Sequence, residues 1–170
     1  MIFYHICNSC KIIFCSLHGS QWKHAILPFA ALPARADWER EAASSNVSLS
    51  QRAKMFLTLI DAGQPVPSTC PYPVQAWRIG EDLTWVLLGG EVVVDYALRL
   101  KRNFGPSTTW VSSYCNDVMA YVPSERVLAE GGYEGDSSMI PYGLPSKWAP
   151  GIEDQIIEAV ARRVRSLKAP

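Results

Sequence analysis

The residues best placed to do chemistry in this sequence are a carboxylate and tyrosines that lie beside glycines. The first is Glu91, which follows Gly89 and Gly90 directly after the apolar run 83–88. Glycines let a backbone approach a ligand closely, and the ligand sites of α/β proteins gather at the ends of strands. A glutamate at the start of a helix can instead only stabilise the helix dipole. The position therefore indicates either a ligand-binding carboxylate or a helix-start residue.

Two later segments place a tyrosine in a similar setting. One is Tyr114-Cys115-Asn116-Asp117-Val118-Met119-Ala120-Tyr121-Val122-Pro123, and the other is Gly131-Gly132-Tyr133-Glu134-Gly135. Catalytic and binding groups are frequent in loops that follow strands, which favours a role for Tyr121 and Tyr133. The alternative is purely structural: an Asx-type turn before Tyr121 with its ring in the core, and a plain flexible turn around Tyr133.

Alternating strand and helix patterns must position these residues. Strands are expected at residues 74–79, 83–88 and 108–113, where apolar, β-branched and aromatic residues dominate. Helices are expected after Asp37, after Ser48 or Ser50, from about Glu91 to Phe104, at 124–130, and from Ile152 onward. Residues 27–33 and the proline-marked stretch 65–73 are expected to be extended or looped, and residues 133–150 to form an ordered functional loop. The order predicts an α/β (or α+β) layered architecture, a mixed sheet with flanking helices.

Length and composition limit the class of protein. The chain has 170 residues and a formal net charge of zero, which predicts one globular domain and argues against nucleic acid as a partner. Cys7 and Cys10 form a CxxC motif beside His5 and His18, but no second ligand pair follows at zinc-site spacing. The segment 1–17 lacks the pattern of an export signal and is too short and polar to span a bilayer. No transmembrane segment is therefore expected.

The order of several motifs resembles the neutral/alkaline non-lysosomal ceramidases, in particular the shorter bacterial branch of that family. The resemblance covers approximately residues 23–167 and is strongest over residues 72–150. The matching motifs are Pro71-Tyr72-Pro73-Val74-Gln75-Ala76-Trp77-Arg78, Leu88-Gly89-Gly90-Glu91, Tyr121-Val122-Pro123-Ser124, Gly132-Tyr133-Glu134-Gly135 and Tyr142-Gly143-Leu144-Pro145. This resemblance divides the chain into a leader, 1–22, and the C-terminal part of a ceramidase-like catalytic domain, 23–170.

The resemblance implies a zinc-dependent amidohydrolase that cleaves the N-acyl bond of ceramide into a fatty acid and sphingosine. By that resemblance, Glu91 and Tyr121 are metal ligands, Tyr121 being counted from Asn116 in an Asn-x-x-x-x-Tyr motif, and Tyr133 lies near the substrate. A carboxylate is an ordinary zinc ligand, and a nearby dication favours the ionised form of a tyrosine. Ceramide or a related N-acyl lipid is the expected substrate.

The family's two zinc-binding histidines and its catalytic serine belong to motifs upstream of the Gly-Glu element. The histidines of this chain are His5, His18 and His24, and none stands in such a motif. Fewer than three protein ligands do not make an ordinary catalytic zinc site. We therefore expect a truncated or frame-disrupted enzyme that needs a missing N-terminal part. Alone, it should be inactive, and it should be unstable, aggregation-prone or dependent on a partner, because apolar faces would be exposed.

Two other functions remain open at this stage. The chain could be a non-catalytic accessory or binding protein with a degenerate ceramidase fold, as the absent histidines suggest. It could also be part of an amidohydrolase for another N-acyl lipid, because the motifs describe the metal site and not the acyl chain. Relatives are usually secreted or periplasmic, but the segment that would carry an export signal is the one expected to be missing.

Overall fold

A computed structural model describes residues 17–168 and shows a mixed α/β fold, as expected from the sequence. Four strands form one sheet in the order β1-β2-β3-β5: β1 (Leu17–Pro28), β2 (Thr69–Ile79), β3 (Leu83–Leu88) and β5 (Thr109–Ser112). The pairs β1–β2 and β2–β3 are antiparallel, and β3–β5 is parallel. Two short strands, β4 (Glu91–Val92) and β6 (Tyr121–Val122), form a separate parallel pair. The sheet is therefore mixed, with a small parallel pair beside it.

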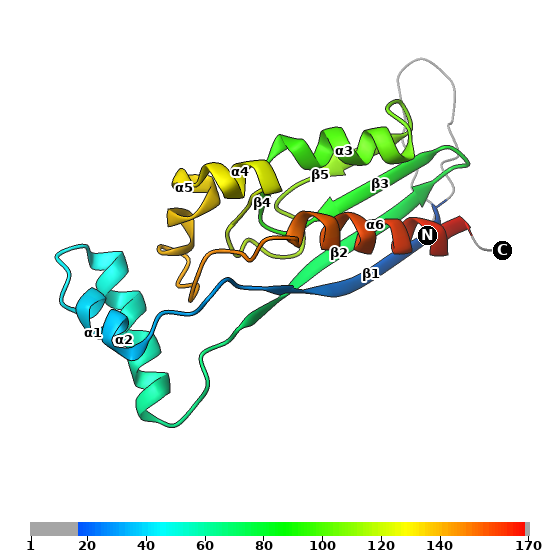
Figure 1. Cartoon of the computed structure of the whole chain (residues 1–170). Helices are drawn as coiled ribbons and strands as arrows, with labels where there is room; N and C mark the ends of the chain where they lie inside the picture. The colour runs from blue at the N-terminus through cyan, green and yellow to red at the C-terminus, as the bar shows by residue number, and fades with distance from the viewer. Residues whose placement is uncertain (1–16, 169–170) are drawn as a thin grey trace, which may run out of the picture.

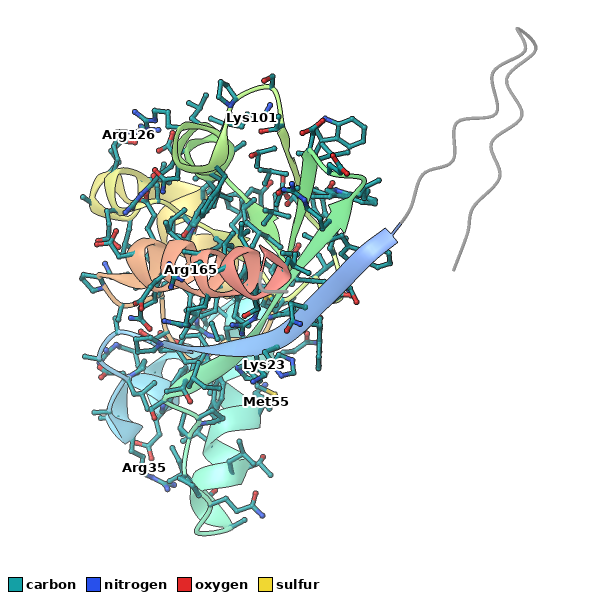
Figure 2. The ribbon with its side chains drawn as sticks, turned by 90° about the vertical axis from the view of Figure 1, so that its right-hand side faces the viewer. Lys23, Arg35, Met55, Lys101, Arg126 and Arg165 are labelled. Atoms are coloured by element: carbon teal, nitrogen blue, oxygen red, sulfur yellow. The ribbon has the colours of Figure 1, made fainter. Side chains whose placement is uncertain are left out.

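Helices cover one side of the four-stranded sheet. Helix α3 (Val94–Phe104) and helix α6 (Ile152–Lys168) both lie on that side, as Figures 1 and 2 show. The predicted stripe of α6 is confirmed, since Ile152, Ile156, Val160 and Val164 are all buried. They pack with the inward residues of β2 and β3, including Val74 and Val86, into one core. Burial of this apolar surface is the main stabilising contribution to the fold.

A helical pair projects from the sheet between β1 and β2. Helix α1 (Arg35–Ala42) and helix α2 (Val47–Asp61) form it, and it lies at one end of the molecule in Figure 1. Its own small core contains Trp38 and Phe56, whose ring centroids are 4.9 Å apart. Asn46 caps α2 by accepting a hydrogen bond from the backbone N–H of Leu49 at 3.1 Å. The pair is therefore held by local contacts of its own.

The remaining segments connect the sheet to α6. Helix α4 (Glu125–Glu130), which was expected at 124–130, is capped by Ser124 and is followed by α5 (Gly132–Gly135) and a short 3-10 helix, η1 (Ser137–Met139). The region expected to be one ordered loop, 133–150, thus includes most of α5 and all of η1. Met139 and Trp148 within it are buried, so packing against the core orders the region.

Several element boundaries differ from the sequence expectation. Helices α1 and α2 begin at Arg35 and Val47, so Asp37, Ser48 and Ser50 lie inside them and do not cap them. The helix expected from Glu91 begins at Val94, because Glu91 and Val92 pair with β6 instead. Strand β2 begins at Thr69, inside the proline-marked stretch. Pro71 and Pro73 are tolerated there because β2 pairs with β3 only from Val74 onward, so no hydrogen bond to that neighbour is required.

The first strand is also longer than the extended stretch 27–33 that the sequence indicates. Residues 17–28 pair continuously with β2 apart from an irregularity between Leu17 and Gly19. Residues 17–22, which the resemblance assigns to a leader, therefore lie in the same sheet as residues 23–28. His5, Cys7 and Cys10 lie outside the described residues. Within residues 17–168, no helix combines the length and apolar character needed to cross a membrane.

Candidate metal and substrate site

The short β4–β6 pair brings Glu91 and Tyr121 side by side. In its parallel register Glu91 lies opposite Tyr121, and Val92 lies opposite Val122. Val122 is fully buried and Val92 packs against the main core, so the valines anchor the pair from one face. Because neighbouring residues of a strand point to opposite faces, Glu91 and Tyr121 share the other face. The two residue pairs of this ladder thus bring together residues that lie 30 positions apart in the sequence.

Backbone hydrogen bonds fix the turn that precedes Glu91. Gly90 has φ +64°, and a Cβ there would lie 2.6 Å from the carbonyl oxygen of Ala120, so only glycine fits. The N–H group of Gly90 donates to the backbone carbonyl oxygen of Asp117 at 2.8 Å, and the N–H group of Glu91 donates to that of Ala120 at 2.9 Å. The glycine pair therefore lets the backbone pass close to the segment that carries Tyr121, whereas the sequence suggested a close approach to a ligand.

Ser113 joins the two sides of this turn through its hydroxyl group. The Oγ of Ser113 donates to the carbonyl oxygen of Gly90 at 2.8 Å and accepts from the N–H of Val92 at 3.0 Å. The next residue, Tyr114, has φ +59°, an uncommon backbone conformation for a residue with a side chain, and its N–H also donates to Gly90, at 2.8 Å. Residues 113 and 114 therefore hold the backbone of the site from the end of β5.

The Glu91 carboxylate controls the ionisation of two tyrosines. Hydrogen bonding with Glu91 is the largest cause that raises the pKa of Tyr121 to about 12, with desolvation and the negative charge of Glu91 as further causes. A second hydrogen bond, between Tyr114 and Glu91, is the largest cause that raises the pKa of Tyr114. In the absence of a cation, both phenols are therefore neutral donors toward one carboxylate at neutral pH.

Tyr133 completes the group that the sequence singled out. Its ring, on α5, packs edge-on against the ring of Tyr121, with centroids 5.4 Å apart and planes at 69°. Tyr133 is 51% exposed, so this residue remains accessible from solvent while its ring contacts Tyr121. The structure thus brings together Glu91, Tyr121 and Tyr133. The core packing considered for Tyr121 is not what is found, because it is the neighbouring Val122 that is fully buried.

Asn116 and Asp117 take structural positions beside this group. Asp117 accepts a hydrogen bond from the N–H of the next residue, Val118, at 2.8 Å, and not from the residue two positions on, as the Asx-type turn considered from the sequence would require. Asn116 has φ +69° and donates from Nδ2 to Oε1 of Gln75 on β2 at 3.2 Å. These two residues therefore shape the loop that leads from β5 to Tyr121.

Sequence reasoning gave no role to Tyr114, which the structure places beside Glu91, or to Tyr142, which lies near Tyr114. Tyr142 lies close enough to contribute to the raised pKa of Tyr114. Both residues stand in segments that the sequence had singled out, and the signal available was an aromatic hydroxyl in each. Their positions depend on the path of the chain after β5 and after η1, which residue spacing does not predict.

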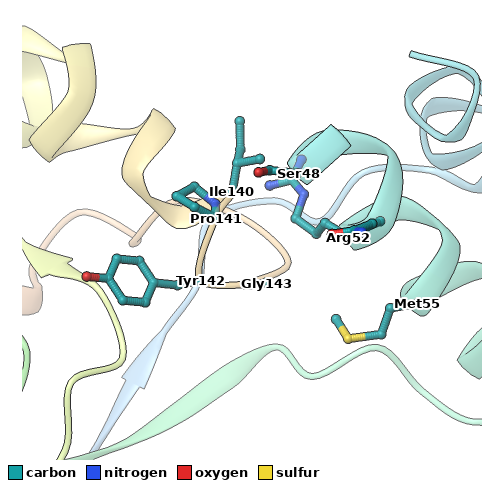
Figure 3. Close-up of a pocket in the computed structure, with 8 residues that line it drawn as sticks. Ser48, Arg52, Met55, Ile140, Pro141, Tyr142 and Gly143 are labelled. Atoms are coloured by element: carbon teal, nitrogen blue, oxygen red, sulfur yellow. The ribbon is translucent and has the colours of Figure 1, made fainter. Parts of the chain in front are cut away.

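A shallow cavity borders this region between α2 and residues 140–143. It encloses about 230 Å³ and is lined in part by Ser48, Gln51, Arg52 and Tyr142. Figure 3 shows the ring of Tyr142 pointing away from Arg52 and Met55. Pockets that bury a drug-sized ligand enclose roughly 300–1,000 Å³ and are mostly apolar. This cavity is too small and too polar to hold the long chains of a ceramide.

The donor chemistry around Glu91 fits part of a zinc site. A carboxylate and a phenol oxygen on adjacent strands can both bind zinc. Within residues 17–168, however, no three His, Cys, Asp or Glu side chains come together in a way that could hold a metal ion. His24 lies exposed on β1, in register with Pro73, and is not part of such a group. The described residues therefore offer two candidate oxygen donors and not a complete set of ligands.

Comparison of the chain with models of known protein families, with curated proteins and with solved structures finds no match.

Proposed function

We propose that this chain is part of a zinc-dependent amidohydrolase that resembles neutral ceramidase and hydrolyses the N-acyl bond of ceramide or a related lipid. The observation that carries the proposal is the pairing of Glu91 with Tyr121 across β4 and β6, with the ring of Tyr133 5.4 Å from that of Tyr121. The motif resemblance assigns these same three residues to metal and substrate. Two short strands with no other evident purpose hold them together.

In this proposal the roles follow from the chemistry of each side chain. Glu91 and Tyr121 hold the metal through oxygen atoms, and the remaining ligands are histidines of the missing N-terminal part. Zinc, when bound, polarises the amide carbonyl or activates a water molecule. Tyr133 is accessible from solvent, and its hydroxyl can donate a hydrogen bond to the carbonyl oxygen, where negative charge develops during hydrolysis. Tyr114 donates a hydrogen bond to Glu91 and orients its carboxylate.

The chain alone is expected to be inactive, because two oxygen ligands do not make an ordinary catalytic zinc site. A missing N-terminal part would have to supply the histidines and the serine nucleophile. Export to the periplasm or the cell exterior would likewise be a property of the whole enzyme.

The first test is the nucleotide sequence upstream of the Met1 codon, translated in every reading frame. Histidine-bearing zinc motifs and a serine motif there support the proposal. The joined protein should then hydrolyse a fluorescent ceramide, and Glu91→Gln should lower kcat/KM by at least about 100-fold, the usual scale for loss of a transition-state contact. Glu81→Gln, in the exposed turn between β2 and β3, is the matched control and should leave activity unchanged.

Two outcomes would direct the proposal elsewhere. If no such motifs lie upstream, Glu91 and Tyr121 have no partners for zinc, and a non-catalytic accessory or binding role for the same fold becomes the better account. If the joined protein cleaves other N-acyl substrates and not ceramide, the zinc chemistry stands and the acyl substrate changes.

A further inference from the structure

On the side of the sheet opposite α3 and α6 no described helix packs, and the loop after β5 reaches it only at Pro73 and Gln75, through Met119 and Asn116. This side, here called the open face, is formed by the even-numbered residues 20–26 of β1, the odd-numbered residues 71–79 of β2 and 83–87 of β3, and Trp110 and Ser112 of β5. In Figure 2 the helices lie on one side of the strands and none lies on the other. A four-stranded sheet normally buries both faces or makes the exposed one polar.

The open face is aromatic where a solvated face would be polar. Each of its strands contributes one tryptophan: Trp22, Trp77, Trp85 and Trp110. Trp77 and Trp85 lie opposite each other with ring centroids 6.4 Å apart, and they are only partly exposed. Trp22 and Trp110, on the two edge strands, are 50% and 57% exposed. Tryptophan is strongly enriched where proteins contact one another.

The absence of charged side chains also distinguishes the open face from a solvated surface. None of the residues that define the open face is Lys, Arg, Asp or Glu, although charged residues make up 19% of the chain. His24 is the only titratable side chain among them. On the covered face, by contrast, Lys23 and Arg78 are at strand positions. Two copies of an uncharged face can approach each other without like-charge repulsion.

The size of the open face suits a weak but specific interface. Four strands about 4.8 Å apart, each contributing about six residues at about 3.3 Å, cover roughly 400 Å² in projection. An exposed apolar patch of roughly 300–600 Å² is already large for a monomer, and specific interfaces bury upward of roughly 1,000 Å² over both partners. Because side chains add relief to the projected area, two such faces together reach the lower end of that range.

We propose that the open face binds a second copy of this chain, so that two sheets pack face to face as a symmetric dimer. Sheets packed in this way lie about 10 Å apart with their side chains interdigitated. With a two-fold axis along the strands, β1 of one copy lies over β5 of the other, which brings Trp22 of each copy toward Trp110 of its mate. The proposal does not depend on the zinc site, because Glu91 and Tyr121 are not residues of this face.

The test measures the mass of the full chain by sedimentation equilibrium across a dilution series. The expected result is a species of twice 18.9 kDa that dissociates in the micromolar range. The double variant Trp22→Lys/Trp110→Lys places like charges on both copies and should weaken association by at least about 100-fold. The control Met55→Lys/Leu98→Lys adds the same charge at exposed apolar residues of α2 and α3 and should dimerise like the original chain.

A charge-reversal experiment separates loss of the interface from loss of folding. Trp22→Glu/Trp110→Glu should also be monomeric by itself, and mixing it with the lysine variant should restore a dimer, since opposite charges then meet across the interface. Four results would overturn the proposal: a monomer at every concentration, an association that the lysine variant retains, a loss of association that the control shares, or no dimer on mixing the two folded variants. Large assemblies that the lysine variant still forms would point to pairing of strand edges instead.

Discussion

Replacing Glu91 by Gln should lower the pKa of Tyr121 substantially. The pKa of Tyr121 is raised from 10.0 to about 12, with the hydrogen bond to Glu91 as the largest cause. In this variant the negative charge of Glu91 is lost, and the phenol can donate only a weaker, uncharged hydrogen bond to the amide oxygen. The glutamine keeps the size of the side chain but carries no charge. Desolvation and the neighbouring tyrosines remain, so a fall of about one pH unit or more, and not a full return to 10.0, is expected.

The assay is a pH titration of isotope-labelled tyrosine followed by nuclear magnetic resonance, in which Tyr121→Phe identifies the resonance of Tyr121. Because the site is exposed, added salt should reduce the shift in the original chain and have little effect in the variant. The matched control is Glu134→Gln, which removes an exposed carboxylate next to Tyr133 without touching Glu91. It should leave the pKa of Tyr121 near 12.

The raised pKa of Tyr121 also contributes to the alkaline stability of the fold, beside the buried Tyr72 and Tyr96, whose pKa values burial raises. A folded-state pKa above the unfolded value means that the neutral phenol is the form the fold favours. The resulting stability is fully present below pH 10 and is lost as the pH rises toward about 12. Glu91→Gln should therefore flatten the fall in stability over that window. A Tyr121 that titrates at 10 in the original chain, or one whose pKa is unchanged by Glu91→Gln, would refute the contact between the two side chains.

Two further predictions concern the supports of the site. Gly90→Ala should destabilise the fold more than Gly63→Ala in urea unfolding, because its Cβ would meet the carbonyl oxygen of Ala120 at 2.6 Å in a strained backbone. Gly63→Ala, with a similar φ and open space, should cost about 1–2 kcal/mol, the penalty of the left-handed conformation alone. Equal losses would contradict the close approach. Trp148→Phe should lower the free energy of unfolding by about 1–3 kcal/mol, because it removes the indole N–H that donates to the carbonyl oxygen of Tyr121 at 2.9 Å. An unchanged unfolding midpoint would show that this hydrogen bond is dispensable.

Local patterns predicted the elements whose signal is contained within their own residues. The stripe of Ile152, Ile156, Val160 and Val164 predicted α6, and the buried run 83–88 predicted β3. The fold class followed from the order of such elements. Helix α3 was also expected, but its start was placed too early, because nothing near Glu91 indicates that it pairs with Tyr121.

Contacts between distant segments were the part that local patterns did not predict. Strand β1 was missed over most of its length, since its evidence lies in its pairing with β2 across the helical pair α1–α2. Tyr114 was likewise not assigned to the site, because its position depends on a left-handed backbone conformation and on a hydrogen bond to Gly90. The motif resemblance brought Glu91, Tyr121 and Tyr133 into one hypothesis before their proximity could be known.

The most direct test of the proposed zinc site is the response of Tyr121 to zinc at neutral pH in the protein joined to the upstream part that supplies the histidines. With zinc in excess, we expect the labelled resonance of Tyr121 to move to the position of an ionised phenol, because a bound dication overcomes a pKa of about 12. The change should be lost in Glu91→Gln and retained in Glu134→Gln. A Tyr121 resonance that zinc leaves unchanged, or one that moves equally well without the Glu91 carboxylate, would contradict a metal site shared by these two residues.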